Sequence, residues 1–375
     1  MESKFINEKI LLNHQYEVDI YQYCSLNDEV IVNFKEKLKT NKYKIVLHPC
    51  PICGNDSKWL NVAYSKEGFT WAICQECGLL QNNNRFLQSD LNSFYKTGEY
   101  HRLCMGNLPN DKHFELYSKV GGRSLLLDLE LFNYDIKDKR ILDIGCGPGA
   151  TLLALKNAGA IVKGYDIDNE RIEYGKQFIG EIECRDAFDS SIDFNGYDLI
   201  VINGVLEHLY NPQDFLNKLS KKIISASTNV IIHVPNLEFC FAYSDVSFLK
   251  FLHIGHIWYF TSISIERCLN SAGFQIENIV PRSANMGILC SKSPTPIVNR
   301  QNSYRLSVNA INFANLRNAK VEIESTALLN EIYEKWSNQT SKDKLYNRIK
   351  NKLAHFFAAR SLSEKKEFIR ETISS

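Results

Sequence analysis

A glycine-rich segment at residues 143–149 (DIGCGPG) directly follows a short apolar run at 141–142. In a strand–turn–helix unit, such glycines let the backbone approach a cofactor at the N-terminus of the helix. The spacing Gly145-x-Gly147-x-x-Ala150 also fits a dinucleotide, so the glycines alone do not identify the cofactor. Asp143 favours S-adenosylmethionine (SAM) over a dinucleotide, because its carboxylate would repel a pyrophosphate and attract the ammonium and sulfonium groups of SAM.

A second acidic residue indicates the nucleoside half of the same site. Asp166 ends the next apolar run, about 20 residues further on, where a carboxylate can accept hydrogen bonds from ribose hydroxyls. Dinucleotides need this contact too, so Asp166 predicts a nucleoside without choosing the cofactor. Asp168 lies just before a helical pattern and is predicted to cap that helix.

Four of the 11 cysteines form two closely spaced pairs ahead of this region. Cys50-x-x-Cys53-Gly and Cys74-x-x-Cys77-Gly place four thiolates at the spacing of a tetrahedral zinc site, and the following glycines allow tight turns. A site closed by four cysteines leaves no open position for chemistry, so the predicted zinc is structural. The remaining cysteines are scattered singly, which argues against a disulfide framework.

Short apolar runs alternate with amphipathic segments from residue 140 onward. We expect helices between successive strands, and the predicted strands are 141–142, 161–165, 182–184, 198–202 and 230–234, with a closing pair at 274–280 and 287–290. This alternation predicts an α/β fold built on a doubly wound, mainly parallel sheet. The residues ahead of it, from Asp111 to Phe132, predict a helix that is interrupted near Gly121 and Gly122.

Length and composition indicate a globular protein of two or three folded units. The chain has 375 residues, 44% of them hydrophobic and 23% charged, with a net charge of +1. These values argue against a disordered or membrane-embedded chain, and against a whole-molecule field that would attract nucleic acid. The N-terminal residues do not resemble a signal peptide and no apolar run has the length of a membrane span, so we expect a cytoplasmic protein.

Three segments, 141–149, 162–166 and 197–208, resemble the successive motifs of class I SAM-dependent methyltransferases, and the likeness spans roughly residues 110–292. The resemblance implies a Rossmann-like sheet with the cofactor at its carboxyl edge. It also implies a role for each motif residue: Asp143, Gly145 and Gly147 around the methionine portion, Asp166 on the ribose, Asp186 at the adenine amino group, and Asn203 and Gly204 near the reactive methyl.

The order of parts resembles the sugar methyltransferases of antibiotic and bacterial surface-polysaccharide biosynthesis: a zinc ribbon, a connector with Phe94-Tyr95 and Tyr100-His101, then a methyltransferase domain. Their His-Glu-His-x-x-Tyr-Phe-Ser segment is similar to residues 253–261, where His256, Tyr259 and Phe260 match. Gly255 stands in place of the glutamate, which argues against the carbanion-forming C-methylation of those relatives. The resemblance implies a small acceptor, a sugar or sugar nucleotide, and methylation of a hydroxyl or an amine stays open.

Candidate acid/base residues follow the fourth and fifth strands. His208 follows Glu207 just past the fourth strand, and the resemblance adds His256 and Tyr259. Quinone-ring O-methyltransferases carry the motif Glu-x-x-Glu-His just past their fourth strand, where this chain has residues 204–208, and they can use a divalent ion. Gly204 occupies their first acidic position here, which disfavours a metal-dependent mechanism.

These interpretations divide the chain into residues 1–46 without assigned chemistry, a zinc ribbon and connector at 47–109, the methyltransferase domain at 110–295, and a helical extension at 296–375. Apolar positions between Lys342 and Arg360 fall on one face of a basic amphipathic helix. We expect this helix to pack on the domain or on a second subunit, and the alternative is peripheral membrane contact.

Two other functions stay open from the sequence. An RNA methyltransferase would use the zinc ribbon to hold its substrate, but the residues between the cysteine pairs carry only two lysines and no arginine, so nucleic acid is not the expected partner. A non-catalytic SAM-binding adaptor would not need the candidate acid/base residues. The favoured function is therefore methylation of a small molecule.

Overall fold

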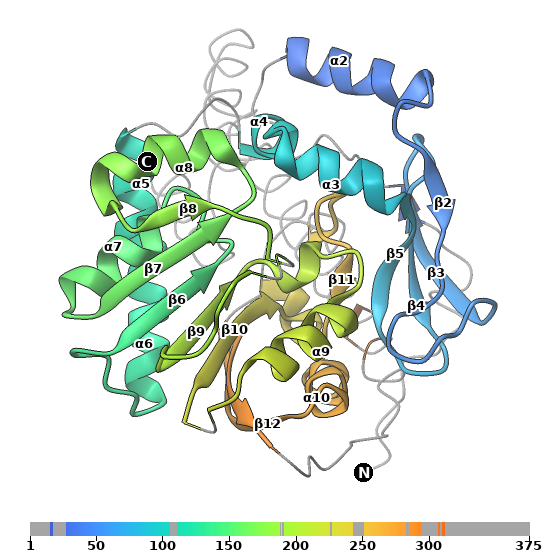
Figure 1. Cartoon of the computed structure of the whole chain (residues 1–375). Coiled ribbons are helices and arrows are strands. Elements are labelled where there is room, and N and C mark those ends of the chain that lie inside the picture. The colour runs from blue at the N-terminus through green and yellow to red at the C-terminus, as the bar shows by residue number, and fades with distance from the viewer. Residues whose placement is uncertain are drawn as a thin grey trace, which may run out of the picture.

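The computed structural model describes residues 16–17, 28–105, 111–187, 189, 191–225, 227–242, 251–282, 285–293, 307 and 310–311. The amphipathic helix expected between Lys342 and Arg360 lies outside these residues. Figure 1 shows two sheets side by side, a larger one with helices on both faces and a smaller one nearer the N-terminus.

The larger sheet has seven strands in the order β12-β13-β10-β9-β6-β7-β8. Strands β8, β7, β6, β9 and β10 are parallel, whereas β13 pairs antiparallel with β10 and β12 antiparallel with β13. This confirms the predicted Rossmann-like α/β fold and every predicted strand, whose bounds are β6 (Arg140–Ile144), β7 (Ile161–Asp166), β8 (Ile182–Cys184), β9 (Leu199–Asn203), β10 (Asn229–Pro235), β12 (Phe274–Arg282) and β13 (Asn285–Lys292).

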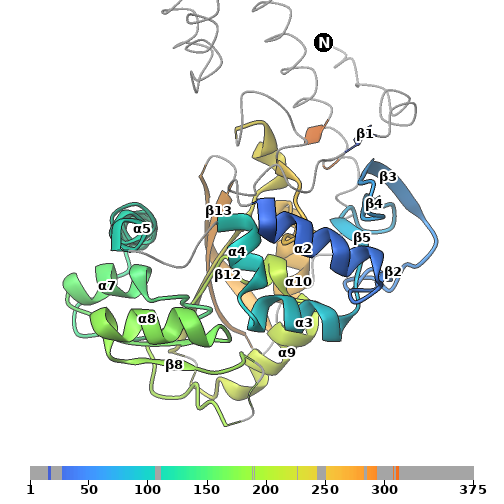
Figure 2. The same cartoon turned by 90° about the horizontal axis from the view of Figure 1, so that it is seen from above.

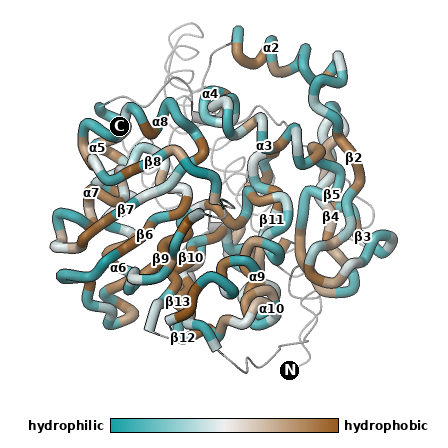
Figure 3. Tube along the Cα trace, viewed as in Figure 1, coloured by the Kyte–Doolittle hydropathy of each residue, from teal (hydrophilic) through white to brown (hydrophobic). Residues whose placement is uncertain are grey.

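Both faces of this sheet are buried, because its central strands carry apolar side chains on both sides of the pleat (Figure 3). Leu199 and Val201 point to a core that includes side chains of α6 (Arg123–Leu131), α7 (Ala150–Asn157) and α8 (Asn169–Ile179). The alternate residues Ile200 and Ile202 point to the opposite core. That core includes side chains of α9 (Pro212–Lys222) and α10 (Ser262–Ser271).

Helix starts agree with the sequence signals. The Asp168 side chain accepts hydrogen bonds from the backbone N–H groups of Glu170 and Arg171 at the start of α8, which confirms the predicted cap. The interruption predicted near Gly121 and Gly122 is a π-helical turn, Ser118–Gly122, between α5 (Asp111–Tyr117) and α6. Gly122 lies against α7 so closely that a Cβ atom there would come within 2.3 Å of the Ala154 Cβ.

The smaller sheet is built from the N-terminal part of the chain, with one strand from elsewhere. Its order is β1-β3-β4-β5-β11 with β2 paired to β5, and the bounds are β1 (Tyr16–Glu17), β2 (Ile45–Leu47), β3 (Trp59–Tyr64), β4 (Thr70–Cys74), β5 (Leu80–Phe86) and β11 (Trp258–Tyr259). Because β11 belongs to the segment at 253–261, that segment links the two sheets. Sequence reasoning missed this pairing.

Three helices of the N-terminal part, α2 (Asp28–Lys39), α3 (Gln88–Lys96) and α4 (Glu99–Met105), complete this architecture. Figure 2 shows them grouped between α8 on one side and the β2–β5 strands on the other. The connector is thereby brought to the carboxyl edge of the larger sheet. Among the described helices, we find none that is long and apolar enough to cross a membrane.

The close contact between the π-helical turn and α7 gives a matched pair of variants. Gly122→Ala should lower the free energy of unfolding by about 1–3 kcal/mol, because the added methyl group overpacks against Ala154. Gly121→Ala should be neutral or slightly stabilising, since its methyl group would meet only Thr151 Oγ1, at 3.9 Å. Urea unfolding followed by circular dichroism measures both, and equal losses would contradict the close helix contact.

Candidate functional site

The glycine-rich loop lies between β6 and α7, at the point where the sheet order reverses from β7 on one side of β6 to β9 on the other. Open α/β sheets bind ligands at this kind of switch point. Gly145 and Gly147 have φ values of 78° and 55°, in the left-handed region that other residues avoid. A Cβ atom on Gly145 would also come within 2.3 Å of Val205 Cγ2.

Two adjoining cavities of about 340 and 200 Å³ open along this edge of the sheet. The first is lined by residues predicted at the methionine portion and the methyl, namely Asp143, Gly145, Gly147, Asn203 and Gly204. The second is lined by Asp166 and Asp186, predicted at the ribose and adenine. Gly145, Gly204 and His208 line both cavities, so the two halves meet where the methyl group is expected.

Asp143 is the acidic group at the methionine end. Its side chain is buried, and its Oδ1 atom has no hydrogen-bond partner among the described residues. Burial, with a smaller contribution from the nearby negative charge of Asp166, raises the pKa of Asp143 well above its ordinary value. An ammonium group in this cavity would supply the missing hydrogen-bond donor and the countercharge. The buried carboxylate therefore fits the ammonium group of SAM.

Asp166 holds the loop and leaves capacity for a ligand. Its Oδ2 accepts a hydrogen bond of 2.7 Å from the Gly147 N–H, and its Oδ1 accepts one of 2.9 Å from the Asp168 N–H. A carboxylate offers about four lone-pair sites, so ribose hydroxyls can still donate to it.

Residues of the connector form part of the cavity walls, which sequence reasoning did not assign. Tyr100 and His101, from α4, line both cavities together with Arg171 of α8. His101 Nδ1 lies 3.2 Å from Asp168 Oδ2, and its other ring nitrogen contacts the Arg171 guanidinium. The only hint in the sequence that this segment reaches the site was the adjacent pair Tyr100 and His101 in the connector.

His208 is fixed in one tautomer by the backbone of the 253–261 segment. Its Nδ1 lies 2.6 Å from the carbonyl oxygen of Gly255, and the Tyr95 hydroxyl donates to that same oxygen at 2.8 Å. A carbonyl oxygen only accepts, so Nδ1 carries the proton and Nε2 is the unprotonated nitrogen. Burial lowers the pKa of His208 to about 4, which keeps the ring neutral at pH 7.

The two other predicted acid/base residues are placed differently. His256 lies beside His208, with ring centroids 4.7 Å apart, and its Nε2 is 3.9 Å from Glu207 Oε1. Tyr259 is fully buried, and its hydroxyl accepts a hydrogen bond of 2.9 Å from the His253 N–H. Tyr259 is not among the residues lining the two cavities, so its geometry favours a positioning role for the loop over contact with an acceptor.

Gly255 explains how the segment departs from the sugar methyltransferase pattern. A Cβ atom at this position would come within 2.3 Å of the Tyr100 ring. The ring therefore occupies the space that the first atoms of a glutamate side chain would need. Gly255, which replaces the glutamate of the motif, thus packs directly against Tyr100 of the connector.

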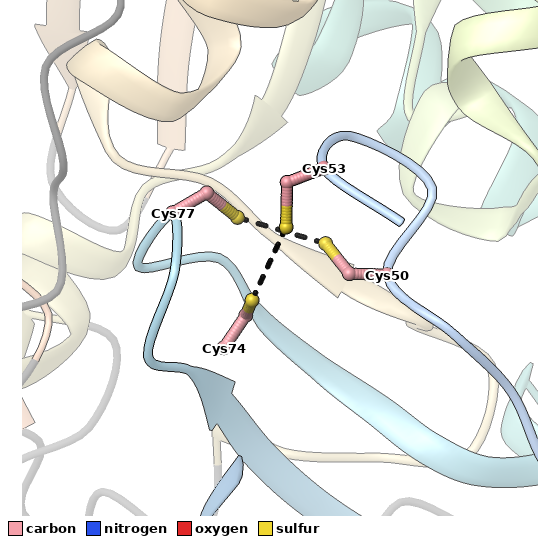
Figure 4. A group of neighbouring side chains, drawn as sticks. All are labelled: Cys50, Cys53, Cys74 and Cys77. Atoms are coloured by element: carbon pink, nitrogen blue, oxygen red, sulfur yellow. Dashed lines mark hydrogen bonds between the residues drawn. The ribbon is translucent and has the colours of Figure 1, made fainter. Parts of the chain in front are cut away.

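The four paired cysteines converge on one point, with their sulfurs directed toward one another (Figure 4). The Sγ atoms of Cys50 and Cys77 lie 3.6 Å apart, and those of Cys53 and Cys74 lie 3.5 Å apart. Four sulfurs bound tetrahedrally at about 2.3 Å from a zinc would be separated by about 3.8 Å. The set of donors therefore fits a four-coordinate zinc ion.

Comparison with known proteins identifies the larger sheet. Residues 123–279 match a family described as a methyltransferase domain. The match covers β6, β7, β8, β9 and β10 of the larger sheet with their intervening helices, and it ends within β12. Residues 123–279 are thus similar to a methyltransferase domain, and the smaller sheet precedes the match, apart from β11.

Curated relatives are similar over shorter stretches. A ubiquinone biosynthesis O-methyltransferase from Coxiella burnetii is 31% identical over 94 residues, which are 24% of this chain and 40% of the relative. The mitochondrial ubiquinone biosynthesis O-methyltransferase of Schizosaccharomyces pombe is 32% identical over 93 residues, 23% of this chain and 34% of that protein. The matched stretches thus span less than half the length of these relatives.

Among solved structures, a SAM-dependent methyltransferase from Mesorhizobium loti is 13% identical, covers 47% of this chain and 100% of its own, and has a TM-score of 0.39. A magnesium protoporphyrin IX methyltransferase from Synechocystis with bound S-adenosylhomocysteine (SAH) is 16% identical, covers 55% of this chain and 100% of its own, and has a TM-score of 0.40.

The unpartnered carboxylate of Asp143 predicts a conflict between stability and cofactor binding. Because burial raises its folded-state pKa above the unfolded value, the ligand-free protein loses stability as pH rises above about 3.8 toward the folded pKa. Asp143→Asn removes this loss, so the melting temperature of the ligand-free variant should exceed that of the unchanged protein by an amount that grows with pH. The same variant should bind SAM more weakly, by on the order of 1–3 kcal/mol.

Thermal melts between pH 5 and pH 8, with and without SAM, measure both effects. Asp56 is exposed, and Asp56→Asn serves as a control that should change neither quantity. If Asp143→Asn lowers stability at every pH and leaves SAM affinity unchanged, the carboxylate has another partner.

Proposed function

We propose that this protein transfers the methyl group of SAM to a small-molecule acceptor bound at the junction of the two cavities. The observation that carries the proposal is the charge distribution along the cleft. A buried carboxylate, Asp143, lies at one end, Asp166 and Asp186 lie at the other, and His208 lies where the two cavities meet. This arrangement suits a cofactor with a cationic amino-acid half and a hydroxyl-rich nucleoside half.

The reaction needs alignment and, for a hydroxyl acceptor, loss of one proton. The acceptor oxygen forms a bond to the methyl carbon as the carbon–sulfur bond breaks, and the bonding pair remains on sulfur as a neutral thioether. SAM is already activated, so holding the two partners in line supplies much of the rate. His208 lies where the two cavities meet, and its Nε2 is unprotonated. We propose that this nitrogen takes the proton from the acceptor hydroxyl.

We propose that His256 and Tyr259 position His208 and its surroundings and do not contact the acceptor themselves. His256 lies next to the His208 ring, and Tyr259 holds the backbone of His253 in the same segment. The acid/base chemistry is thus concentrated on one imidazole, with a second imidazole close by and a phenol that fixes the loop.

We propose a sugar or sugar nucleotide as the acceptor, methylated on oxygen or nitrogen in surface-polysaccharide or secondary-metabolite biosynthesis. The order of the zinc knuckles, connector and methyltransferase domain supports this class, as does the match of His256, Tyr259 and Phe260 to the sugar methyltransferase segment. The similarity to ubiquinone biosynthesis O-methyltransferases supports a hydroxyl on a small molecule. The partner is accordingly a small molecule, with no nucleic acid required.

We also propose that Cys50, Cys53, Cys74 and Cys77 hold a structural zinc ion. The backbone turns that follow each pair place N–H groups of Gly54 and Gly78 on the carbonyls of Cys50 and Cys74, at 2.8 and 2.7 Å. These turns keep the knuckles folded, so the ion would fix the end of the smaller sheet where β4 ends and β5 begins, next to the pairing of β5 with β11.

Methyl transfer from radiolabelled SAM to a panel of nucleotide sugars, simple glycosides and catechols tests the proposed activity. We expect labelled product from a hydroxyl- or amine-bearing sugar derivative, and SAH in equal amount. Label transfer to RNA alone, or SAM binding with no transfer to any small molecule, would contradict the proposed function.

Substitution of His208 tests its role once an acceptor is known. His208→Ala should lower kcat roughly 10²-fold or more with SAM affinity retained, since proton removal contributes about 10²- to 10⁴-fold. Tyr259→Phe should reduce turnover less and thermal stability more, because it leaves the His253 N–H without its acceptor. A larger kcat loss in Tyr259→Phe than in His208→Ala would reverse the assignment.

Removal of one cysteine tests the zinc. Elemental analysis should find about one zinc per chain, and Cys53→Ser should lose it and lower the melting temperature while SAM still binds. Cys184→Ser, at an exposed cysteine outside the cluster, is the matched control and should retain the metal. Fully folded protein without zinc would contradict a structural role.

A further inference from the structure

A second group of potential metal ligands includes His208, which lines both cavities, and two side chains that lie next to it, Glu207 and His256. One ligand atom each from Glu207, His208 and His256 lie within 4.8 Å of one another. Glu207 is 3% exposed and the two imidazoles are part-buried. The proposed function assigns roles to His208 and His256 and none to Glu207.

The missing acidic residue at Gly204 argued against a metal ion on sequence alone, but the structure supplies a different third ligand. His256 lies 48 positions after His208 in the sequence, and the fold places its Nε2 3.9 Å from Glu207 Oε1. Ligands bound at about 2.0–2.2 Å in tetrahedral or octahedral geometry are about 3–3.5 Å apart. The three ligand atoms here lie within 4.8 Å of one another, so side-chain shifts on the order of an ångström would close the set.

Hydrogen bonds orient the His208 ring and hold the backbone beside His256. The Gly255 carbonyl fixes the proton of His208 on Nδ1, which leaves Nε2 for an ion. A hydrogen bond from the ligating imidazole to a backbone carbonyl is the usual way in which metal-binding histidines are oriented. The Ile257 N–H donates to the Glu207 carbonyl at 2.8 Å and thereby anchors His256 opposite the carboxylate.

Glu207 is the group whose surroundings most require a partner. Its Oε2 has no hydrogen-bond partner among the described residues, although the side chain is buried. Its Oε1 lies 3.8 Å from where a Cβ atom on Gly204 would be, at the end of β9 and next to the expected methyl group. A cation bound between Glu207 and His208 would therefore lie close to the position expected for the methyl group.

We propose that Glu207, His208 and His256 form a divalent-cation site that binds the acceptor oxygen beside the methyl group of SAM. This rests on the proposed function and replaces one of its steps: with the ion bound, the ion activates the acceptor, and His208 Nε2 holds the ion instead of taking the proton. Two imidazoles and one carboxylate favour Mn²⁺, Fe²⁺, Co²⁺, Ni²⁺ or Zn²⁺ over Mg²⁺ and Ca²⁺, which prefer oxygen ligands alone.

The site narrows the chemical class of the acceptor. Three protein ligands leave coordination positions open, so an acceptor with two adjacent oxygens, such as a vicinal diol, can bind through both. The ion lowers the pKa of the hydroxyl that it binds, and the proton passes to solvent water, because His208 Nε2 then holds the ion. The resulting alkoxide attacks the methyl carbon as described above.

Mn²⁺ is the suitable probe, since its preference for oxygen and nitrogen donors leaves the thiolate cluster occupied by zinc. Titration of the zinc-loaded protein with Mn²⁺, followed by the loss of the free-ion electron paramagnetic resonance signal, should show one saturable Mn²⁺ per chain. Spin-echo modulation of the bound ion should show imidazole nitrogen. This signature is measured on the unchanged protein and does not depend on any variant folding.

Glu207→Gln and His256→Asn should each weaken Mn²⁺ binding by about tenfold or more. The control His48→Asn alters a buried histidine that is bonded to Tyr210 and lies outside the set, and it should leave Mn²⁺ affinity unchanged. Calorimetric SAM binding should persist in all three variants. Absence of saturable Mn²⁺ binding, or bound Mn²⁺ without nitrogen modulation, would overturn the proposed site.

Activity separates this inference from the proposed function. Turnover of a diol acceptor should rise with Mn²⁺ and fall to a low basal level when a chelator removes Mn²⁺ but leaves the zinc in place. Full turnover without any divalent ion at this site would reject the cation site and leave the methyltransferase function intact. Mn²⁺ binding as described, with no methyl transfer to any acceptor, would instead reject the function.

Discussion

The carboxylate of Asp143 imposes the constraint on which the cleft depends. It is buried at the end of β6 and lacks a hydrogen-bond partner on one oxygen among the described residues, an arrangement that disfavours its ionised form in the ligand-free protein. A cationic ligand relieves the penalty by supplying both charge and hydrogen bonds. The glycine-rich loop, the switch point between β7 and β9, and the buried apolar strands hold this carboxylate where such a ligand can reach it.

The acceptor end of the cleft depends on a different constraint, the pairing of β11 with β5. This pairing fixes residues 253–261 between the two sheets, and the carbonyl of Gly255 then orients the His208 ring. Tyr95 of α3 donates a hydrogen bond to the same carbonyl. The connector, the 253–261 segment and the turn after β9 that holds His208 therefore meet at one oxygen atom. The N-terminal part is thus a wall of the reaction site, and a structural zinc would act on catalysis through this contact.

The sequence predicted the parts of the structure that depend on local signals. Strand periodicity, the Asp168 cap, the π-helical interruption at Gly122 and the approach of the four cysteines are all encoded within short stretches. The two cavities also bring together the seven residues that the methyltransferase resemblance assigned to the cofactor. Their individual contacts with SAM stay predictions.

Contacts between distant segments could not be predicted in this way. Tyr100 fills the space at Gly255, and His256 approaches Glu207, because the 253–261 segment pairs with β5 of the smaller sheet and bridges to Asn236, just past β10 of the larger one. No periodicity in one sequence specifies that register. The same limitation left Tyr259 among the acid/base candidates, although its hydroxyl is bonded to the His253 backbone.

Calorimetric titration of the zinc-loaded protein with SAM, SAH and NAD under identical conditions tests the central claim most directly. SAM and SAH share the ammonium group and nucleoside that the cleft is built to hold, whereas the pyrophosphate of NAD would face the Asp143 carboxylate. We expect saturable binding of SAM and SAH at one site per chain and no binding of NAD. Binding of NAD without binding of SAM would contradict the role of Asp143 and with it the account of the cleft.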